Sequence, residues 1–154
     1  MISVKSKTDL AKMRVAGQIA GGALKLAGES IKAGMTTAHL DKIVHDYIVK
    51  HGAVPSFLGY GGFPASACIS INNEVIHGIP SHSRKIKEGD IVSVDVGAYI
   101  DGFHGDTCAT FGVGKISDEA QALLDVTEAS LYHAISIAKP DIRIGDIGHA
   151  VEEY

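Results

Sequence analysis

The chain has 154 residues, of which 45% are hydrophobic and 21% charged. This composition is typical of a globular domain and argues against a disordered, collagen-like or coiled-coil protein. Its 14 basic and 18 acidic side chains leave a net charge of −4, which gives no sign of a nucleic-acid partner or an anionic membrane surface.

Two helices are predicted at the start of the chain. Small and apolar residues recur every three or four positions from Leu10 to Ile31, which places one stripe along a helix. Thr8 is its predicted N-cap, and the Ala33-Gly34 pair is its predicted end. A second helix is predicted from a cap at Thr37 to a terminator at Gly52.

A loop rich in glycine and aromatic residues, at positions 55–66, separates these helices from an extended region. The predicted strands are 68–71, 74–77, 91–100 and 103–111, with turns at Asn72-Asn73 and Asp101-Gly102. A helix is predicted to start at Ser117 and stop before Pro140, and another covers Ile144 to Tyr154. The pattern therefore indicates an α/β (α+β) protein.

The two longer strands place carboxylates within apolar sequence. Pairing around the second turn sets Asp95 opposite Cys108 and Gly97 opposite Asp106. The two aspartates are then diagonal neighbours on one face, roughly 7–8 Å apart, and His104 shares that face. Buried carboxylates are normally ion-paired, hydrogen-bonded or metal-bound. The spacing suits a divalent cation, although pairing with Lys or Arg, or capping of a turn, remains an alternative.

Other signals of chemistry are absent from the sequence. It has no G-x-S-x-G, phosphate-loop or H-E-x-x-H motif. Cys68 and Cys108 are expected to be buried free thiols. His133 and His149 are expected to be surface residues, or residues with satisfied hydrogen bonds, and not metal ligands. No apolar run is long enough for a signal-peptide core or a membrane span, so we expect a cytoplasmic protein.

Three segments, at residues 58–80, 89–111 and 139–154, closely resemble bacterial-type (type I) methionine aminopeptidases. The resemblance implies the pita-bread fold, in its N-terminal half: two helices, antiparallel β-hairpins and a following helix pair. It also implies that residues 1–154 form a single catalytic domain that lacks its C-terminal part. The family usually has glycine where this chain has Asp141, a difference confined to a turn.

By this resemblance, Asp95 would chelate one metal ion, Asp106 would bridge two, and His77 would be a catalytic residue that contacts the substrate. Four further residues match positions that line the methionine pocket: Phe57, Tyr60, Phe63 and Cys68. The implied cofactors are two divalent ions of cobalt, manganese, iron or zinc. A pocket of aromatic and thiol groups suits a polarizable thioether.

The implied function is removal of initiator methionine from nascent peptides with a small second residue, by a metal-activated water. The family's other three ligands belong to a second half, so the isolated chain is expected to be inactive, with a weak partial site. The parent is expected to be a monomer that associates with the ribosome, and the shorter chain to self-associate. The alternatives are a non-catalytic peptide-binding module and an Xaa-Pro metallopeptidase.

Overall fold

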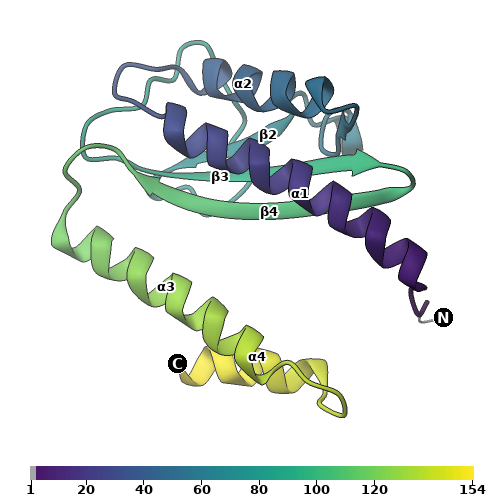
Figure 1. The fold of residues 1–154 in the computed structure, drawn as a ribbon. Coiled ribbons are helices and arrows are strands. Elements are labelled where there is room, and N and C mark those ends of the chain that lie inside the picture. The colour runs from purple at the N-terminus through teal and green to yellow at the C-terminus, as the bar shows by residue number, and fades with distance from the viewer. Residues whose placement is uncertain (1–2) are drawn as a thin grey trace. The chain divides into compact units, whose positions relative to one another are not determined.

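Helices α1 (Lys7–Ser30) and α2 (Thr37–Lys50) pack on one face of an antiparallel sheet, in a unit that ends at Ile116 (Figure 1). The computed structural model describes residues 3–154. Its strands are β1 (Val54–Pro55), β2 (Ala67–Ile71), β3 (Ile91–Ile100) and β4 (Phe103–Gly112). The predicted α/β class is confirmed, whereas β1 was not predicted: Pro55 falls at the start of the predicted loop, and Val54 just before it.

Both N-terminal helices begin at a different cap from the one predicted. Ser6, not Thr8, caps α1: its hydroxyl accepts from the Asp9 N–H, and the Asp9 carboxylate accepts from the Ser6 N–H. This reciprocal capping box satisfies two otherwise unpaired N–H groups, which no cap at Thr8 would do. Thr36 caps α2 in place of Thr37, whose own hydroxyl bonds to a distant loop.

The predicted strand at 74–77 is wrong, since residues 72–90 contain no strand. The Glu74 carboxylate accepts from the Ile71 N–H at 3.1 Å, which replaces the ladder bond that a hairpin would need. His77 has a positive φ of 59°, so the backbone leaves the extended region there. The segment meets β2 again at Gly78, whose carbonyl oxygen accepts from the Ile69 N–H at 2.8 Å.

The predicted register of the β3–β4 hairpin is confirmed. Asp95 lies opposite Cys108, and Gly97 lies opposite Asp106. Asp101 and Gly102 both have positive φ, as a two-residue turn of the favoured hand requires. The even-numbered residues of β3 from Val92 to Ala98 are fully buried against the helices, and Ile100 is partly buried. The odd-numbered residues, including Asp95, therefore project from the opposite face.

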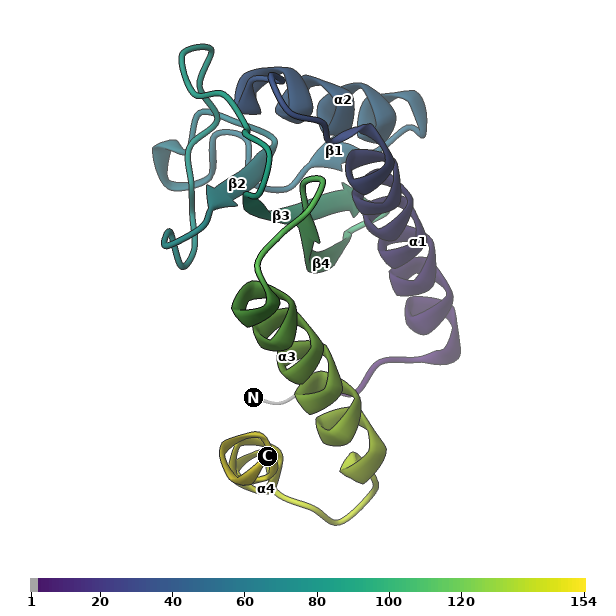
Figure 2. The ribbon, with the colours of Figure 1, turned by 90° about the vertical axis from the view of Figure 1, so that its left-hand side faces the viewer.

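Helix α1 lies so close to β4 that one strand position must be glycine. A Cβ on Gly105 would stand 2.3 Å from the backbone carbonyl carbon of Ala16 and 2.4 Å from the backbone nitrogen of Gly17. Figure 2, turned by 90°, shows α1 beside β3 and β4, the two strands that it contacts. The helix can therefore rest on the sheet only where the side chain is absent.

Strands β1 and β2 follow each other along the same edge of β3. Pro55 pairs with Ala98 and Ala67 pairs with Val96, so a single β3 residue, Gly97, separates the two pairs. Residues 57–66 have no partner in β3 and leave the ladder between them. Residues 57–66 thus form an excursion from one edge of the sheet, and they make up most of the predicted glycine-rich loop.

The second unit, Ser117–Tyr154, consists of α3 (Asp118–Ile137) and α4 (Ile144–Glu153). Ser117 caps α3, as predicted, by accepting from the Ala120 N–H. The predicted helix pair is confirmed, and Asp141 between the helices has a positive φ of 72°, a conformation that glycine adopts more easily. Within residues 3–154, no helix is both long and apolar enough to cross a membrane.

Candidate functional site

Asp95 and Asp106 lie together on the sheet face that points away from α1 and α2. Asp95 is half-buried on β3, and Asp106 is exposed on β4. Burial raises the pKa of Asp95 to about 6, and the charge of Asp106 and a hydrogen bond between the two carboxyl groups also raise it. Across residues 3–154, no Lys or Arg forms an ion pair with either group.

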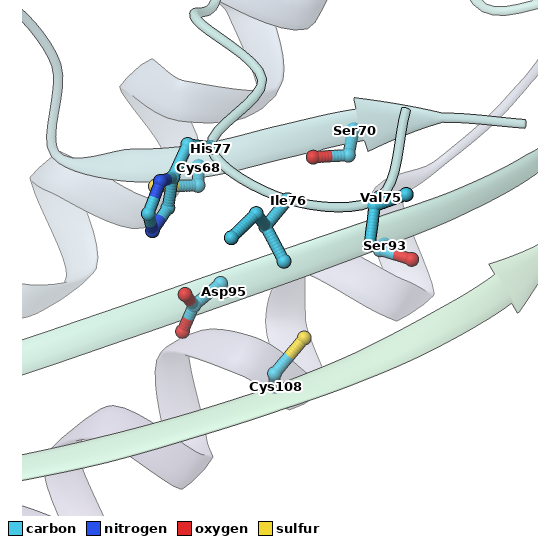
Figure 3. A pocket seen from close by; sticks show the side chains of 8 residues that line it. All are labelled: Cys68, Ser70, Val75, Ile76, His77, Ser93, Asp95 and Cys108. Atoms are coloured by element: carbon cyan, nitrogen blue, oxygen red, sulfur yellow. The ribbon is translucent and has the colours of Figure 1, made fainter. Parts of the chain in front are cut away.

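A pocket of about 40 Å³ opens beside Asp95 (Figure 3). This volume has room for about three water molecules. Strands β2, β3 and β4 and the loop after β2 supply its walls: Cys68, Ser70, Val75, Ile76, His77, Ser93, Asp95 and Cys108. Polar groups and two aliphatic side chains therefore meet next to the carboxylate pair.

His77 reaches this pocket from the loop, not from a strand. Its left-handed backbone is held where Gly78 approaches β2, because a Cβ on Gly78 would stand 2.2 Å from the Ile69 carbonyl oxygen. Figure 3 shows the imidazole beside Cys68, above Asp95. The charge of His77 lowers the pKa of Asp95 and so partly offsets its burial. Strained backbone of this kind persists where the surroundings enforce it.

The structure brings together some of the residues predicted for the site. Cys68, His77 and Asp95 line the pocket. Phe57 lies on the same sheet face, since a Cβ on Gly97 would meet its ring at 2.7 Å. Tyr60 is 82% exposed and Phe63 lies outside the pocket lining, so the described pocket does not include them.

Sequence reasoning missed several lining residues. Ser70 and Ser93 stand two positions along their strands from Cys68 and Asp95, so strand alternation could have placed both on the same face as these residues. Val75 and Ile76 gave no usable signal, because their segment was predicted to be a strand. The fifth missed lining residue, Cys108, was predicted only to be a buried thiol.

The two cysteines differ in their surroundings. Cys68 is buried, as predicted, but Cys108 is exposed, so the prediction for Cys108 is wrong. Its strand position places it on the sheet face that points away from α1 and α2. Burial, together with the charge of Asp95, raises the pKa of the Cys68 thiol to about 11. It therefore stays protonated near neutral pH and is a poor nucleophile.

The carboxylate pair fits part of a divalent-metal site. Two neighbouring carboxylates repel each other in a partly dry environment, and a cation between them removes that cost. Within the part of the chain that the structure describes, no group of three or more His, Cys, Asp or Glu side chains could hold a metal ion. These residues would thus supply two ligands, and a stable coordination sphere needs more.

The raised pKa of Asp95 predicts a pH-dependent stability of the metal-free protein. The folded state holds the Asp95 proton more tightly than the unfolded state, so this stabilisation is complete below the ordinary aspartate pKa of 3.8 and is lost as pH rises through about 6. Between pH 4.5 and 7 we expect Asp95 to contribute a fall of about 1–2 kcal/mol, allowing for its partial exposure.

Urea unfolding in EDTA at both pH values measures this effect. The change in unfolding free energy should be smaller in Asp95→Asn than in the unaltered chain by that amount. Equal changes in the two proteins would show that the Asp95 carboxyl is not perturbed.

Comparisons with known proteins agree with this geometry. The chain matches metallopeptidase family M24 over residues 11–154. It is 49% identical over 154 residues to a methionine aminopeptidase of Clostridium acetobutylicum, covering 100% of this chain and 62% of that protein. It is 47% identical over 154 residues to methionine aminopeptidase 1 of Bacillus subtilis, again covering 100% of this chain and 62% of the relative.

A solved structure agrees equally well. The crystal structure of methionine aminopeptidase from Rickettsia prowazekii matches with a TM-score of 0.97 at 38% identity, covering 100% of this chain and 62% of that one. The predicted pita-bread architecture is thereby confirmed. The chain spans about three-fifths of the length of these relatives. Since the family match extends over far more than half of its residues, the chain belongs to metallopeptidase family M24.

Proposed function

We propose that this protein functions in the hydrolytic removal of N-terminal methionine from peptides, with Asp95 and Asp106 as metal ligands. The observation that carries the proposal is the pair of carboxylates, diagonal neighbours on β3 and β4, that lies beside a pocket and forms no ion pair within residues 3–154. Relatives named methionine aminopeptidase match the whole of this chain, which supports methionine as the residue removed.

The two aspartates divide the metal-binding role in this proposal. Asp95 would chelate one divalent ion, and Asp106, which is more exposed and lies across the hairpin, would bridge two. When bound, such ions would supply Lewis-acid activation of the scissile carbonyl and of a water molecule. Carboxylate oxygen is an acceptable ligand for cobalt, manganese, iron and zinc alike, so the donor set does not favour one of them.

The other side chains serve to hold the substrate. His77, at the pocket edge next to Asp95, hydrogen-bonds the peptide or transfers a proton to or from it. Cys68 contributes a neutral thiol to the pocket wall. Phe57, Tyr60 and Phe63 supply apolar surface for a thioether, for which sulfur–aromatic contacts contribute about 0.3–1.5 kcal/mol.

The physiological setting follows from this activity. The substrate is the initiator methionine of nascent chains with a small second residue, met in the cytoplasm near the ribosome. Residues 1–154 act as one catalytic domain. The complete enzyme is a monomer, whereas the isolated chain self-associates, because large apolar residues of α3 such as Leu123, Leu131 and Ile135 are more than half exposed.

Hydrolysis of Met-Ala-Ser with Mn²⁺ or Co²⁺ tests the proposed function. Two proteins are compared: the 154-residue chain, and the same chain joined to the part of the C. acetobutylicum relative that has no counterpart in it. We expect methionine release by the joined protein and none by the chain alone. Turnover by the chain alone would show that no further ligands are needed. A folded but inactive joined protein would contradict the proposal.

The same joined protein separates the alternatives. An Xaa-Pro metallopeptidase would hydrolyse an Xaa-Pro dipeptide faster than Met-Ala-Ser. A non-catalytic module would bind the tripeptide whether or not EDTA is present and would hydrolyse neither substrate.

A further inference from the structure

Asp41 makes contacts that the stability of its own helix does not require. It is the fifth residue of α2, beyond the first turn in which an acidic side chain stabilises a helix. Its Oδ1 accepts from two successive main-chain N–H groups, Ser66 at 2.8 Å and Ala67 at 2.9 Å. Among residues 3–154, no Lys or Arg forms an ion pair with it.

The location of these bonds is the junction at which the excursion rejoins the sheet. Ala67 is the first residue of β2, and Cys68, which lines the pocket, comes next. The Ser66 hydroxyl hydrogen-bonds to Nδ1 of His45, one turn further along α2, at 2.8 Å. Ser66 is only 2% exposed, so α2 holds this junction from inside the protein.

The other end of the excursion is attached independently. The Ser56 N–H donates to the Gly97 carbonyl oxygen at 2.9 Å, and the Ser56 hydroxyl hydrogen-bonds to His104 Nδ1 at 2.8 Å. Phe57 then rests on Gly97. The excursion is thus tied to β3 and β4 at its start and to α2 at its finish.

Between the two attachments, the excursion bonds mainly to itself. The Gly59 N–H donates to the Phe63 carbonyl oxygen at 2.8 Å, and the Phe63 N–H donates to the Tyr60 carbonyl oxygen at 2.9 Å. Gly59, Gly61 and Gly62 all have positive φ, so the turn is compact. The orientation of such a turn on the sheet is set mainly by the two ends that are attached to it.

We propose that Asp41 is a positioning residue for the methionine pocket. Its carboxylate fixes where β2 begins, and thereby fixes both Cys68 in the pocket wall and the body that carries Tyr60 and Phe63. The anchoring is a property of this chain; that it shapes a methionine pocket rests on the proposed function. Charge-assisted bonds to main-chain N–H groups are stronger than neutral ones, which suits a role in orientation.

Amide hydrogen exchange of the 154-residue chain tests the anchoring. In Asp41→Ala, the Ser66 and Ala67 amides should exchange about tenfold faster or more. Asp41→Asn keeps an oxygen acceptor of the same shape and should show a smaller increase. Asp46→Ala is the matched control, because it removes an exposed carboxylate of the same helix that pairs with Lys42, and it should leave both amides unchanged.

The amide of Val94, in the core of β3, separates local from global effects. Faster exchange at Ser66 and Ala67 with Val94 unchanged supports positioning. An equal acceleration of all three amides would show a loss of overall stability instead and would overturn the proposal. Unchanged exchange at Ser66 and Ala67 in folded Asp41→Ala would overturn it too.

Thiol labelling and the response to L-methionine test whether the anchoring by Asp41 affects the pocket. Asp41→Ala should raise the labelling rate of Cys68 relative to that of exposed Cys108, and an unchanged ratio counts against a role in the pocket. L-methionine should shift the amide resonances of Tyr60, Phe63 and Cys68 in the unaltered chain, and less in Asp41→Ala. If the unaltered chain shows no response to L-methionine, the proposed function fails, while the exchange and labelling results still decide the anchoring.

Discussion

Asparagine at both Asp95 and Asp106 is expected to abolish divalent-metal binding by the chain. The two carboxylates are the negative oxygen donors on their face of the sheet, and asparagine keeps their shape while removing both charges. Since even the outer partners of metal ligands contribute about 10–100-fold to affinity, loss of two ligands should weaken binding by more than about 100-fold. Calorimetric titration with MnCl₂ and with CoCl₂ measures the change.

Asp101→Asn provides the matched control for this experiment. Asp101 belongs to the same hairpin, is exposed and has a positive φ, which asparagine tolerates well. Binding should therefore survive this substitution. The double variant should also fold, because it removes two charges that repel each other. Metal binding retained by the folded double variant would mean that the ligands lie elsewhere.

Alanine at Gly105 is expected to destabilise the protein by at least about 3 kcal/mol, at or above the usual cost of overpacking. Its Cβ would stand 2.3 Å from a backbone carbon of α1. Backbone cannot move aside as a flexible side chain does, so α1 would have to lift from β4. Urea unfolding monitored by circular dichroism gives the loss directly, with valine at Gly105 expected to be worse.

Gly17→Ala is the control, from the helix side of the same contact. A Cβ at Gly17 meets no atom within 4 Å, and alanine is favoured over glycine inside a helix by about 0.5–1 kcal/mol. This variant should be slightly more stable than the unaltered chain. Similar effects of the two substitutions would refute the argument that Gly105 is required by close contact.

The hairpin and the helices were predictable because local signals agree with their final packing. Asp101-Gly102 fixes the turn, and once the turn is fixed the register places Asp95 opposite Cys108 without further information. The strand predicted at 74–77 failed for a specific reason. Glu74 takes the main-chain N–H of Ile71, and sequence alternation cannot reveal that a side chain competes for a ladder bond.

In the candidate site, too, the features set by local sequence were predictable and those set by contacts between distant segments were not. Its aspartate pair follows from strand register, which is local. The position of His77 instead depends on the close approach of Gly78 to β2, a contact between segments that no periodicity describes. The exposure of Tyr60 likewise depends on how the excursion folds on itself. The resemblance to a family named these residues, but it did not supply their arrangement.

Only Gly97 of β3 lies between the residues that pair with β1 and those that pair with β2, so the segment that joins β1 to β2 can change in length without a shift of register. If residues 57–66 were removed, Ser56 would join Ala67 and one unbroken strand would run along β3 in register. The sheet that carries the carboxylates does not depend on the length of the excursion. The excursion can therefore gain or lose residues by insertion or deletion while Asp95 and Asp106, the metal ligands of the proposed function, keep their places on the sheet.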